Sequence, residues 1–197
     1  AQHILTGLMP EDAGLLGDGA EYTMMAWTRF ATTAPGGDDE DGMIFGQFGE
    51  NVLHHGARGD QYHMGHWDND LTAGSVELDE WHHVAWRYKE GNLEIFVDGE
   101  SIGTDAKLGF PDPSEIIIGA TRSDQDRDFS GDLDDVRVYD GAVSKAEIAA
   151  VVAFKPRSGG SIAGLLGYWP EEYVTTDSDH RELGVLPVLT ANSGFTW

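Results

Sequence analysis

The hydrophobic positions of this chain fall in short runs that alternate with polar residues and end at turn signals. Val84, Trp86 and Tyr88 recur at every second position, and so do Leu93 and Ile95 a few residues later. An alternation of period two is typical of strands that bury one face. The strands predicted in this way are Tyr22–Phe30, Met43–Phe48, Gln61–Trp67, Trp81–Lys89, Leu93–Val97, Glu100–Gly103, Glu115–Gly119 and Asp132–Tyr139.

Two turn signals lie in the middle of this pattern. Glu90-Gly91-Asn92 separates one pair of predicted strands, and Asp98-Gly99 separates the next pair. Asp-Gly supplies the positive backbone angles that a two-residue hairpin turn requires. The central strands are therefore expected to form antiparallel hairpins with a well-defined register.

One helix is expected, near residues 144–152. Ser144 is the predicted N-cap, and Glu147 three residues later completes a capping box. The apolar side of the helix consists of Ile148, Val151 and Val152. Many short strands with a single helix indicate an all-β, two-sheet antiparallel sandwich.

Composition restricts the class of protein further. The chain has 197 residues, of which 40% are hydrophobic, a length that fits one domain. It contains no Cys, which excludes a disulfide framework. No apolar run is long enough to span a membrane, and the start of the chain shows no signal-peptide pattern.

The charge is strongly negative, with 35 acidic against 12 basic residues and a formal net charge of −23. Such a field repels nucleic acid and anionic membranes, so neither is expected as a partner. The acidic residues are spread along the chain, which favours a salt-adapted protein; calcium-rich extracellular surroundings are the alternative. Asp38 to Asp41 is predicted to be an exposed acidic loop.

Two segments resemble a known family. Phe129–Ile148 reads FSGDLDDVRVYDGAVSKAEI, and Trp81–Gly103 reads WHHVAWRYKEGNLEIFVDGESIG. They are similar to the closing signature and the central hairpins of the laminin-G-like, concanavalin A-like jelly rolls. The resemblance implies a jelly-roll sandwich. It does not select a ligand, because adhesion modules, lectins and glycan-cleaving enzymes share this architecture.

The end of the chain departs from the usual family order. Residues 1–154 form the predicted jelly roll, 155–160 a linker and 161–197 a terminal segment. Leu165–Pro170 resembles the first strand of the family although it comes last here. Circular permutation, a truncated second repeat and a strand donated to a neighbouring subunit all account for this. The segment is too short for its own core and is expected to complete a jelly roll, its own or a neighbour's.

Calcium is the expected cofactor, in a structural role. By the match to the family signature, Asp134 is the transferred ligand. Asp124, Asp126 and Asp128 form a second acidic run that opens like a helix-loop-helix calcium loop. Phe129 then occupies the place of the required Gly, so only a looser calcium loop is expected. The alternative for the signature is that its acids, Asp132, Asp134 and Asp135, cap turns and pair with Arg137. The alternative for the second run is a solvated acidic turn buffered by Arg122 and Arg127.

Catalytic chemistry has little support. Glucanases of this architecture carry acids at alternating positions on one strand, whereas Glu77-Leu78-Asp79-Glu80 has a different spacing and is predicted to be a loop. Six of the eight histidines fall between His54 and His83. His63 and His66 would point to opposite faces of one strand, so packing roles are favoured over a zinc site.

A sugar contact is predicted around Trp67. An exposed indole stacks on a sugar face while nearby polar groups bond its hydroxyls, and His63, Asp68 and Asp70 lie close in sequence. Trp27, Trp81 and Trp86 are assigned to the core instead.

The function expected from these observations is non-catalytic. The chain is predicted to be a binding or adhesion module on an exterior surface of a cell or virus particle, for example a decoration, turret or tail component. Its partner would be a glycan or a surface protein, with homo-oligomer or virion assembly as a further possibility. The alternative is a polysaccharide-degrading enzyme or its carbohydrate-binding module.

Overall fold

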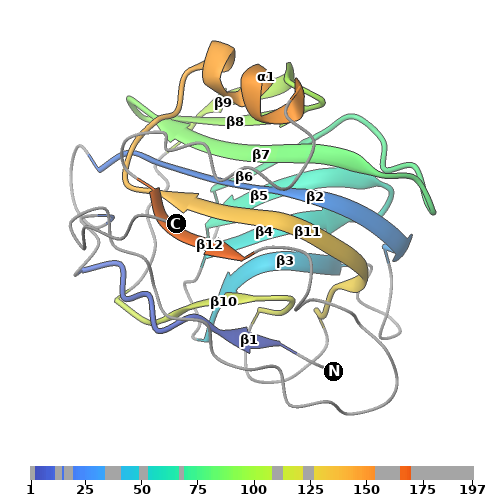
Figure 1. Ribbon diagram of the computed structural model, residues 1–197, viewed down its shortest axis with the longest axis horizontal. Coiled ribbons are helices and arrows are strands. Elements are labelled where there is room, and N and C mark those ends of the chain that lie inside the picture. The colour runs from blue at the N-terminus through green and yellow to red at the C-terminus, as the bar shows by residue number, and fades with distance from the viewer. Residues whose placement is uncertain are drawn as a thin grey trace.

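The computed structural model describes residues 3–11, 15, 20–33, 41–48, 53–66, 69–107, 113–121, 127–153 and, for the backbone alone, 165–169. Within these residues, two antiparallel sheets face one another and a single short helix lies on one of them (Figure 1). The predicted all-β sandwich is confirmed.

Sheet A has six strands. Their spatial order is β1 (Ile4–Leu5), β10 (Ile116–Ile118), β3 (Asp41–Gln47), β4 (Leu53–Arg58), β5 (Gln61–His66) and β6 (Asn69–Ala73). Sheet B also has six, in the order β12 (Leu165–Trp169), β11 (Ser130–Tyr139), β2 (Tyr22–Thr32), β7 (His82–Lys89), β8 (Asn92–Val97) and β9 (Glu100–Ala106). Strands that are distant in sequence are therefore neighbours in both sheets, as a jelly roll requires.

The two predicted turns lie where the sequence indicated. Glu90 and Gly91 join β7 to β8 with φ of 48° and 76°, and Asp98 and Gly99 join β8 to β9 with φ of 50° and 83°. Positive φ at both central positions matches the right-handed twist of the flanking strands. These hairpins fix the register of one half of sheet B.

The main core lies between the sheets. Its largest fully buried side chains include Trp86 from β7, Tyr22 from β2 and Phe45 from β3. Trp86 contacts Phe45 edge to face, with ring centroids 5.8 Å apart. Trp86 is therefore a core residue, as predicted.

Helix α1 (Lys145–Ala153) covers the outer face of sheet B. Its buried residues Ile148 and Val151 pack on Met25, Phe96 and Tyr139 of that sheet. At its start the Ser144 hydroxyl accepts a hydrogen bond from the Glu147 amide, and the Glu147 carboxylate accepts one from the Ser144 amide. The predicted capping box is confirmed.

Strand β12 brings the terminal segment back to sheet B. It pairs antiparallel with β11 of the same chain, and Val136 lies opposite Trp169. The linker 155–160 and residues 170–197 lie outside the described residues.

Candidate functional site

The outer face of sheet A carries the polar residues that the fold brings together. Leu53 and Ala57 of β4 and Met64 of β5 point into the core, so the positions next to them on each strand, such as 54, 58, 63 and 65, point outward. We call this outward set the β4–β6 face; it consists of His54 and Arg58 from β4, His63 and Gly65 from β5, and Asp70 from β6. No helix of the described part of the chain covers it.

Strand register explains why these residues meet. His54 lies directly opposite Gly65, and Gly65 lies directly opposite Asp70 on the next strand. His63 precedes Gly65 by two positions and shares its face. Three side chains therefore surround one glycine.

Ion pairs orient Asp70. Arg58 Nη1 donates to Asp70 Oδ2 at 2.6 Å, and Arg58 Nε donates to Asp41 Oδ1 at 3.0 Å. Arg127 Nη1 also lies 3.2 Å from Asp41 Oδ2. Arg58 and Asp70 keep 34% and 33% of their side chains exposed. The result is a charged pair that is fixed in direction but still reaches solvent.

Asp41 corrects one expectation. The sequence placed it in an exposed acidic loop, yet it opens β3 and is buried between Arg58 and Arg127. The structure shows that a carboxylate in an acidic run becomes buried where two arginines neutralise it.

The surroundings shift the pKa values of this face. Burial lowers the pKa of His63 to about 2, assisted by the positive charge of Arg58, so its ring is neutral. Burial alone would raise the pKa of Asp70, but the neighbouring His54 and His63 rings and the Arg58 guanidinium lower it below its ordinary value. Asp70 is therefore an ionised acceptor throughout the neutral range.

Two of the predicted ligand-binding residues lie together on this face. His63 Nε2 is 3.9 Å from Asp70 Oδ1, and the His63 ring stacks on His54 with centroids 5.1 Å apart. Trp67 and Asp68 lie outside the described residues, so the predicted stacking tryptophan stays a prediction. Sequence reasoning missed His54 and Arg58, because it did not predict β4.

Tryptophan Trp81 is placed differently from the expectation. The sequence predicts a core position, but 43% of Trp81 is exposed, and the Arg29 guanidinium lies 5.6 Å from its ring. The sequence contains a sign of this difference. Residues 81 and 86 fall on opposite faces of any regular strand, so both tryptophans cannot point into the same core. Trp27 is partly buried on the outer face of sheet B, where its ring meets His83 edge to face.

The predicted calcium ligands fall on separate elements. Asp134 lies buried on β11 opposite Trp27, beside a bulge in that strand. Asp128 forms an isolated bridge with Met43, while Asp124 and Asp126 lie outside the described residues. Among the described residues, neither Asp134 nor Asp128 belongs to a group of three or more side-chain ligand atoms close enough to share a metal ion. Calcium at these positions stays a prediction.

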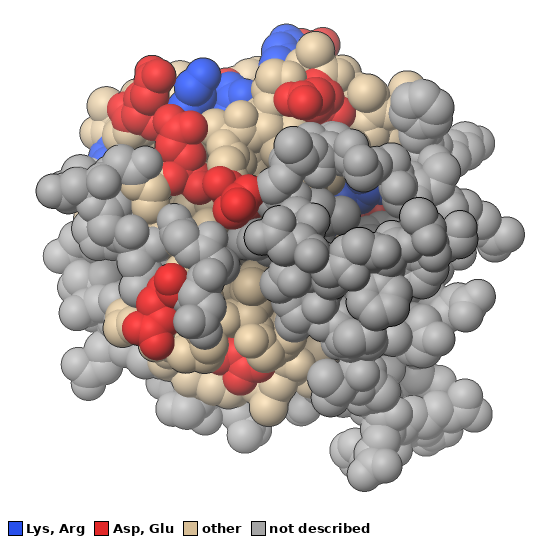
Figure 2. All heavy atoms as spheres, turned by 60° about the vertical axis from the view of Figure 1, so that its left-hand side comes forward, with Lys and Arg blue, Asp and Glu red and all other residues tan. Residues whose placement is uncertain are grey.

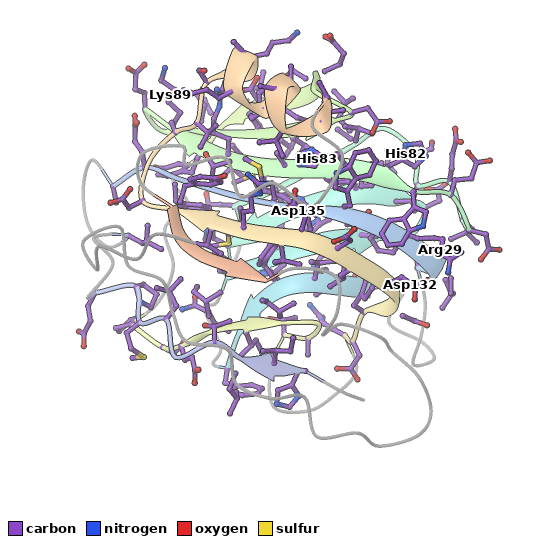
Figure 3. All side chains as sticks on the ribbon, in the orientation of Figure 1. Arg29, His82, His83, Lys89, Asp132 and Asp135 are labelled. Atoms are coloured by element: carbon purple, nitrogen blue, oxygen red, sulfur yellow. The ribbon has the colours of Figure 1, made fainter. Side chains whose placement is uncertain are left out.

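Two other acids of the family signature on β11 form ion pairs with arginines. Asp132 pairs with Arg29 of β2, and Figure 3 shows the two side by side at one end of these strands. Asp135 lies further along β11 and pairs with Arg137. Pairing with arginine is the alternative that the sequence left open for these acids.

The remaining histidines and acids divide between the core and the surface. His66 points inward, where Tyr22 Oη lies 2.7 Å from its Nε2 and 3.0 Å from His55 Nε2. His63 and His66 thus occupy opposite faces, as predicted. Glu77 and Glu80 lie exposed in the turn before β7, with His82 nearby.

The surface agrees with the acidic composition. Figure 2 shows carboxylates spread over the described part of one face, with most of the visible basic side chains near its upper edge. Within the described residues, no helix is both long and apolar enough to cross a membrane.

Comparison with solved structures finds the same sandwich in proteins of distant sequence. A candidate carbohydrate binding protein from Bacteroides ovatus is 20% identical with a TM-score of 0.63, covering 81% of this chain and 48% of its own. The chain thus spans about half the length of that protein. A heptameric SAP-like pentraxin from Limulus polyphemus is 17% identical, with a TM-score of 0.55 and coverage of 71% and 74%.

A third similar structure contains a bound sugar. It is domain 4 of AbnA, an extracellular arabinanase from Geobacillus stearothermophilus, in complex with arabinotriose. It is 14% identical with a TM-score of 0.54, covering 71% of this chain and 69% of its own. The comparison with curated proteins finds no match.

Family assignment follows from the sequence itself. A laminin-G-type family model of the concanavalin A-like lectin/glucanases superfamily matches residues 7–149. This range runs from the loop after β1 into α1 and includes both segments that resembled the family. The chain therefore belongs to the concanavalin A-like lectin/glucanase superfamily.

Proposed function

We propose that this chain is a non-catalytic carbohydrate-recognition module that acts at an exterior surface of a cell or a virus particle. The observation that carries the proposal is the partly exposed Arg58–Asp70 ion pair on the outer face of sheet A, whereas α1 packs on sheet B. A guanidinium and a carboxylate held in fixed directions supply donors and acceptors for sugar hydroxyls. Asp41 also accepts a hydrogen bond from Arg58, so the Arg58 side chain is already ordered. Binding a sugar therefore costs little further side-chain conformational entropy.

The similar structures add weight to a sugar ligand. One is described as a candidate carbohydrate binding protein, and another holds arabinotriose. At these low identities the resemblance establishes the fold alone. The sugar ligand here is inferred from the β4–β6 face, and its identity is open to screening.

The electrostatics of the face favour binding over catalysis. A glycosidase needs a general acid whose pKa is raised, opposite a second free carboxylate. The pKa of Asp70 is lowered, and Asp41 is enclosed by two arginines. Neither acid is suited to protonate a leaving oxygen.

Screening of the labelled chain on a glycan array, followed by calorimetric titration of the best oligosaccharide, tests this proposal. Arg58→Ala and Asp70→Ala should each weaken binding by about tenfold or more, equivalent to about 1.4 kcal/mol. Lys145→Ala is the matched control, since it breaks an exposed ion pair with Glu100 on the α1 side. Its affinity should equal that of the unmodified chain.

Two results would redirect the assignment. If no oligosaccharide binds while a surface protein or a symmetric assembly is captured, the partner is protein. If a polysaccharide is cleaved, and Glu77→Ala or Asp79→Asn abolishes the cleavage, the chain is an enzyme. Asn is chosen at position 79 because the backbone there has a φ of 62°.

A further inference from the structure

Three ligand atoms converge over Gly65. A Cβ built on this glycine would lie 2.4 Å from His54 Nε2, 2.5 Å from His63 Nε2 and 2.5 Å from Asp70 Oδ1. Any side chain at this position would collide with all three. The absence of a side chain at Gly65 therefore leaves space next to two imidazole nitrogens and one carboxylate oxygen, all of which can be metal ligands.

Two of these groups have buried polar atoms without a hydrogen-bond partner. His63 is fully buried and neither of its ring nitrogens has a partner, although the ring lies against its neighbours on the face. Asp70 Oδ1 faces His54 Nε2 at 3.3 Å but likewise lacks a directed hydrogen bond. Unpaired buried polar atoms are costly and rare in folded proteins, so their convergence points to a bound ion or water.

The donor set and its spacing suit a transition metal. Tetrahedral zinc at about 2.0–2.2 Å from each ligand places neighbouring ligand atoms roughly 3.4 Å apart. The separations from Asp70 Oδ1 are 3.3 Å to His54 Nε2 and 3.9 Å to His63 Nε2, and all three atoms lie within 4.8 Å of one another. Calcium prefers an all-oxygen shell, and two imidazoles exclude it here.

Arg58 orients Asp70 for metal binding. It occupies Asp70 Oδ2 and leaves Oδ1 directed at the histidines. The charge of Arg58 is offset by Asp41, so it does not repel a cation as an isolated guanidinium would. The strongly acidic surface raises the local concentration of cations further.

We propose that His54 Nε2, His63 Nε2 and Asp70 Oδ1 bind one divalent transition-metal ion of the zinc class, with water in the fourth position. The ion lies further from the backbone than a Cβ would, over the α-hydrogens of Gly65. This inference concerns metal binding alone and holds whether or not the face binds sugar.

The test uses the whole chain, stripped of metal with a chelator and titrated with zinc chloride by calorimetry. One equivalent should bind, and the melting temperature should rise by several degrees at a zinc concentration about a hundred times the dissociation constant. Calcium chloride should give no such binding at this site. In the same protein, cobalt chloride should give the visible absorption of four-coordinate cobalt with nitrogen and oxygen ligands.

Variants locate the ion. His63→Ala and Gly65→Ala should each weaken zinc binding by at least about a hundredfold, the first by removing a ligand and the second by occupying the space beneath the ion. His82→Ala is the control, because it removes a histidine from the separate Glu77, Glu80 and His82 cluster. Its zinc affinity should be unchanged.

Equal zinc affinity in the unmodified chain, His63→Ala and Gly65→Ala would overturn the proposal, as would the absence of any stoichiometric binding. If a variant does not fold, the cobalt spectrum of the unmodified chain decides, since an octahedral spectrum contradicts the predicted ligand set. Glycan titrations on the metal-free chain keep the two proposals separate. If the metal-free chain binds no sugar, the zinc proposal is unaffected. If the chain binds no zinc, the sugar proposal is unaffected.

Discussion

Arg137 and Asp135 lie two residues apart on β11 and form a two-point ion pair with almost no exposure. Arg137 Nε meets Asp135 Oδ1 at 2.8 Å, and Nη2 meets Oδ2 at 2.8 Å. The two residues are two positions apart at the bulge of β11, so the pair is local to the family signature. It neutralises a carboxylate that would otherwise be buried and charged.

Asp135→Asn should destabilise the chain by roughly 3 kcal/mol, because breaking a buried pair leaves the Arg137 charge uncompensated. Asn accepts the left-handed backbone at position 135, where φ is 51°, so the change reports on charge. Asp132→Asn is the control, since its partner Arg29 is 44% exposed and the loss should be below about 1 kcal/mol. Urea unfolding measures both, and similar losses in the two variants would contradict the prediction.

Acid should weaken the fold through buried histidines. Burial lowers the pKa of His83 to about 4, with a further contribution from Arg137, and burial also lowers the pKa of His66 to about 3. Between pH 6.5 and 4 the unfolded chain binds protons that the folded chain does not. The free energy of unfolding should therefore fall as the pH falls through this window.

Urea unfolding at pH 7 and pH 4.5 measures this loss. His83→Gln should lose less stability between the two pH values than the unmodified chain does. His3→Gln, at an exposed position, should behave like the unmodified chain. Identical pH dependence in all three proteins would show that His83 does not contribute.

Salt should stabilise the chain. A formal net charge of −23 makes the compact state repel itself, and raising the salt from about 0.1 M to about 1 M shortens the screening length from roughly 10 Å to 3 Å. The melting temperature should rise steadily with potassium chloride. A constant or falling melting temperature would argue against adaptation to salt.

Calcium at Asp134 remains a separate prediction. If Asp134 is a ligand, calcium chloride raises the melting temperature beyond the effect of potassium chloride at equal ionic strength, and Asp134→Ala removes the difference. Asp132→Ala, on the same strand, should keep it. No calcium-specific rise in the unmodified chain would eliminate the site.

Much of the fold could be predicted because its signals are local. The hairpin at Asp98-Gly99 and the cap at Ser144 are short motifs that determine their own conformation. Strands β4 and β6 escaped prediction for the opposite reason. Their sequences, LHHGAR and NDLTA, combine glycine, histidine and short polar residues, and they are strands because neighbouring strands pair with them.

The candidate site depended on those two strands. His63 and Asp70 were selected from sequence, but their meeting with His54 over Gly65 depends on a register across three strands. The sequence disfavours a zinc site because alternation along one strand directs His63 and His66 to opposite faces. Alternation along a strand is visible in a sequence, whereas contact across strands requires the pairing to be known.

The central claim is that sugar binds on the β4–β6 face, and a crystal structure with the best oligosaccharide of the array tests it most directly. The account predicts sugar density beside Arg58 and Asp70, with hydroxyls within hydrogen-bond distance of both side chains. Density confined to the α1 side or to the turn at Trp81, with the β4–β6 face empty, would contradict it.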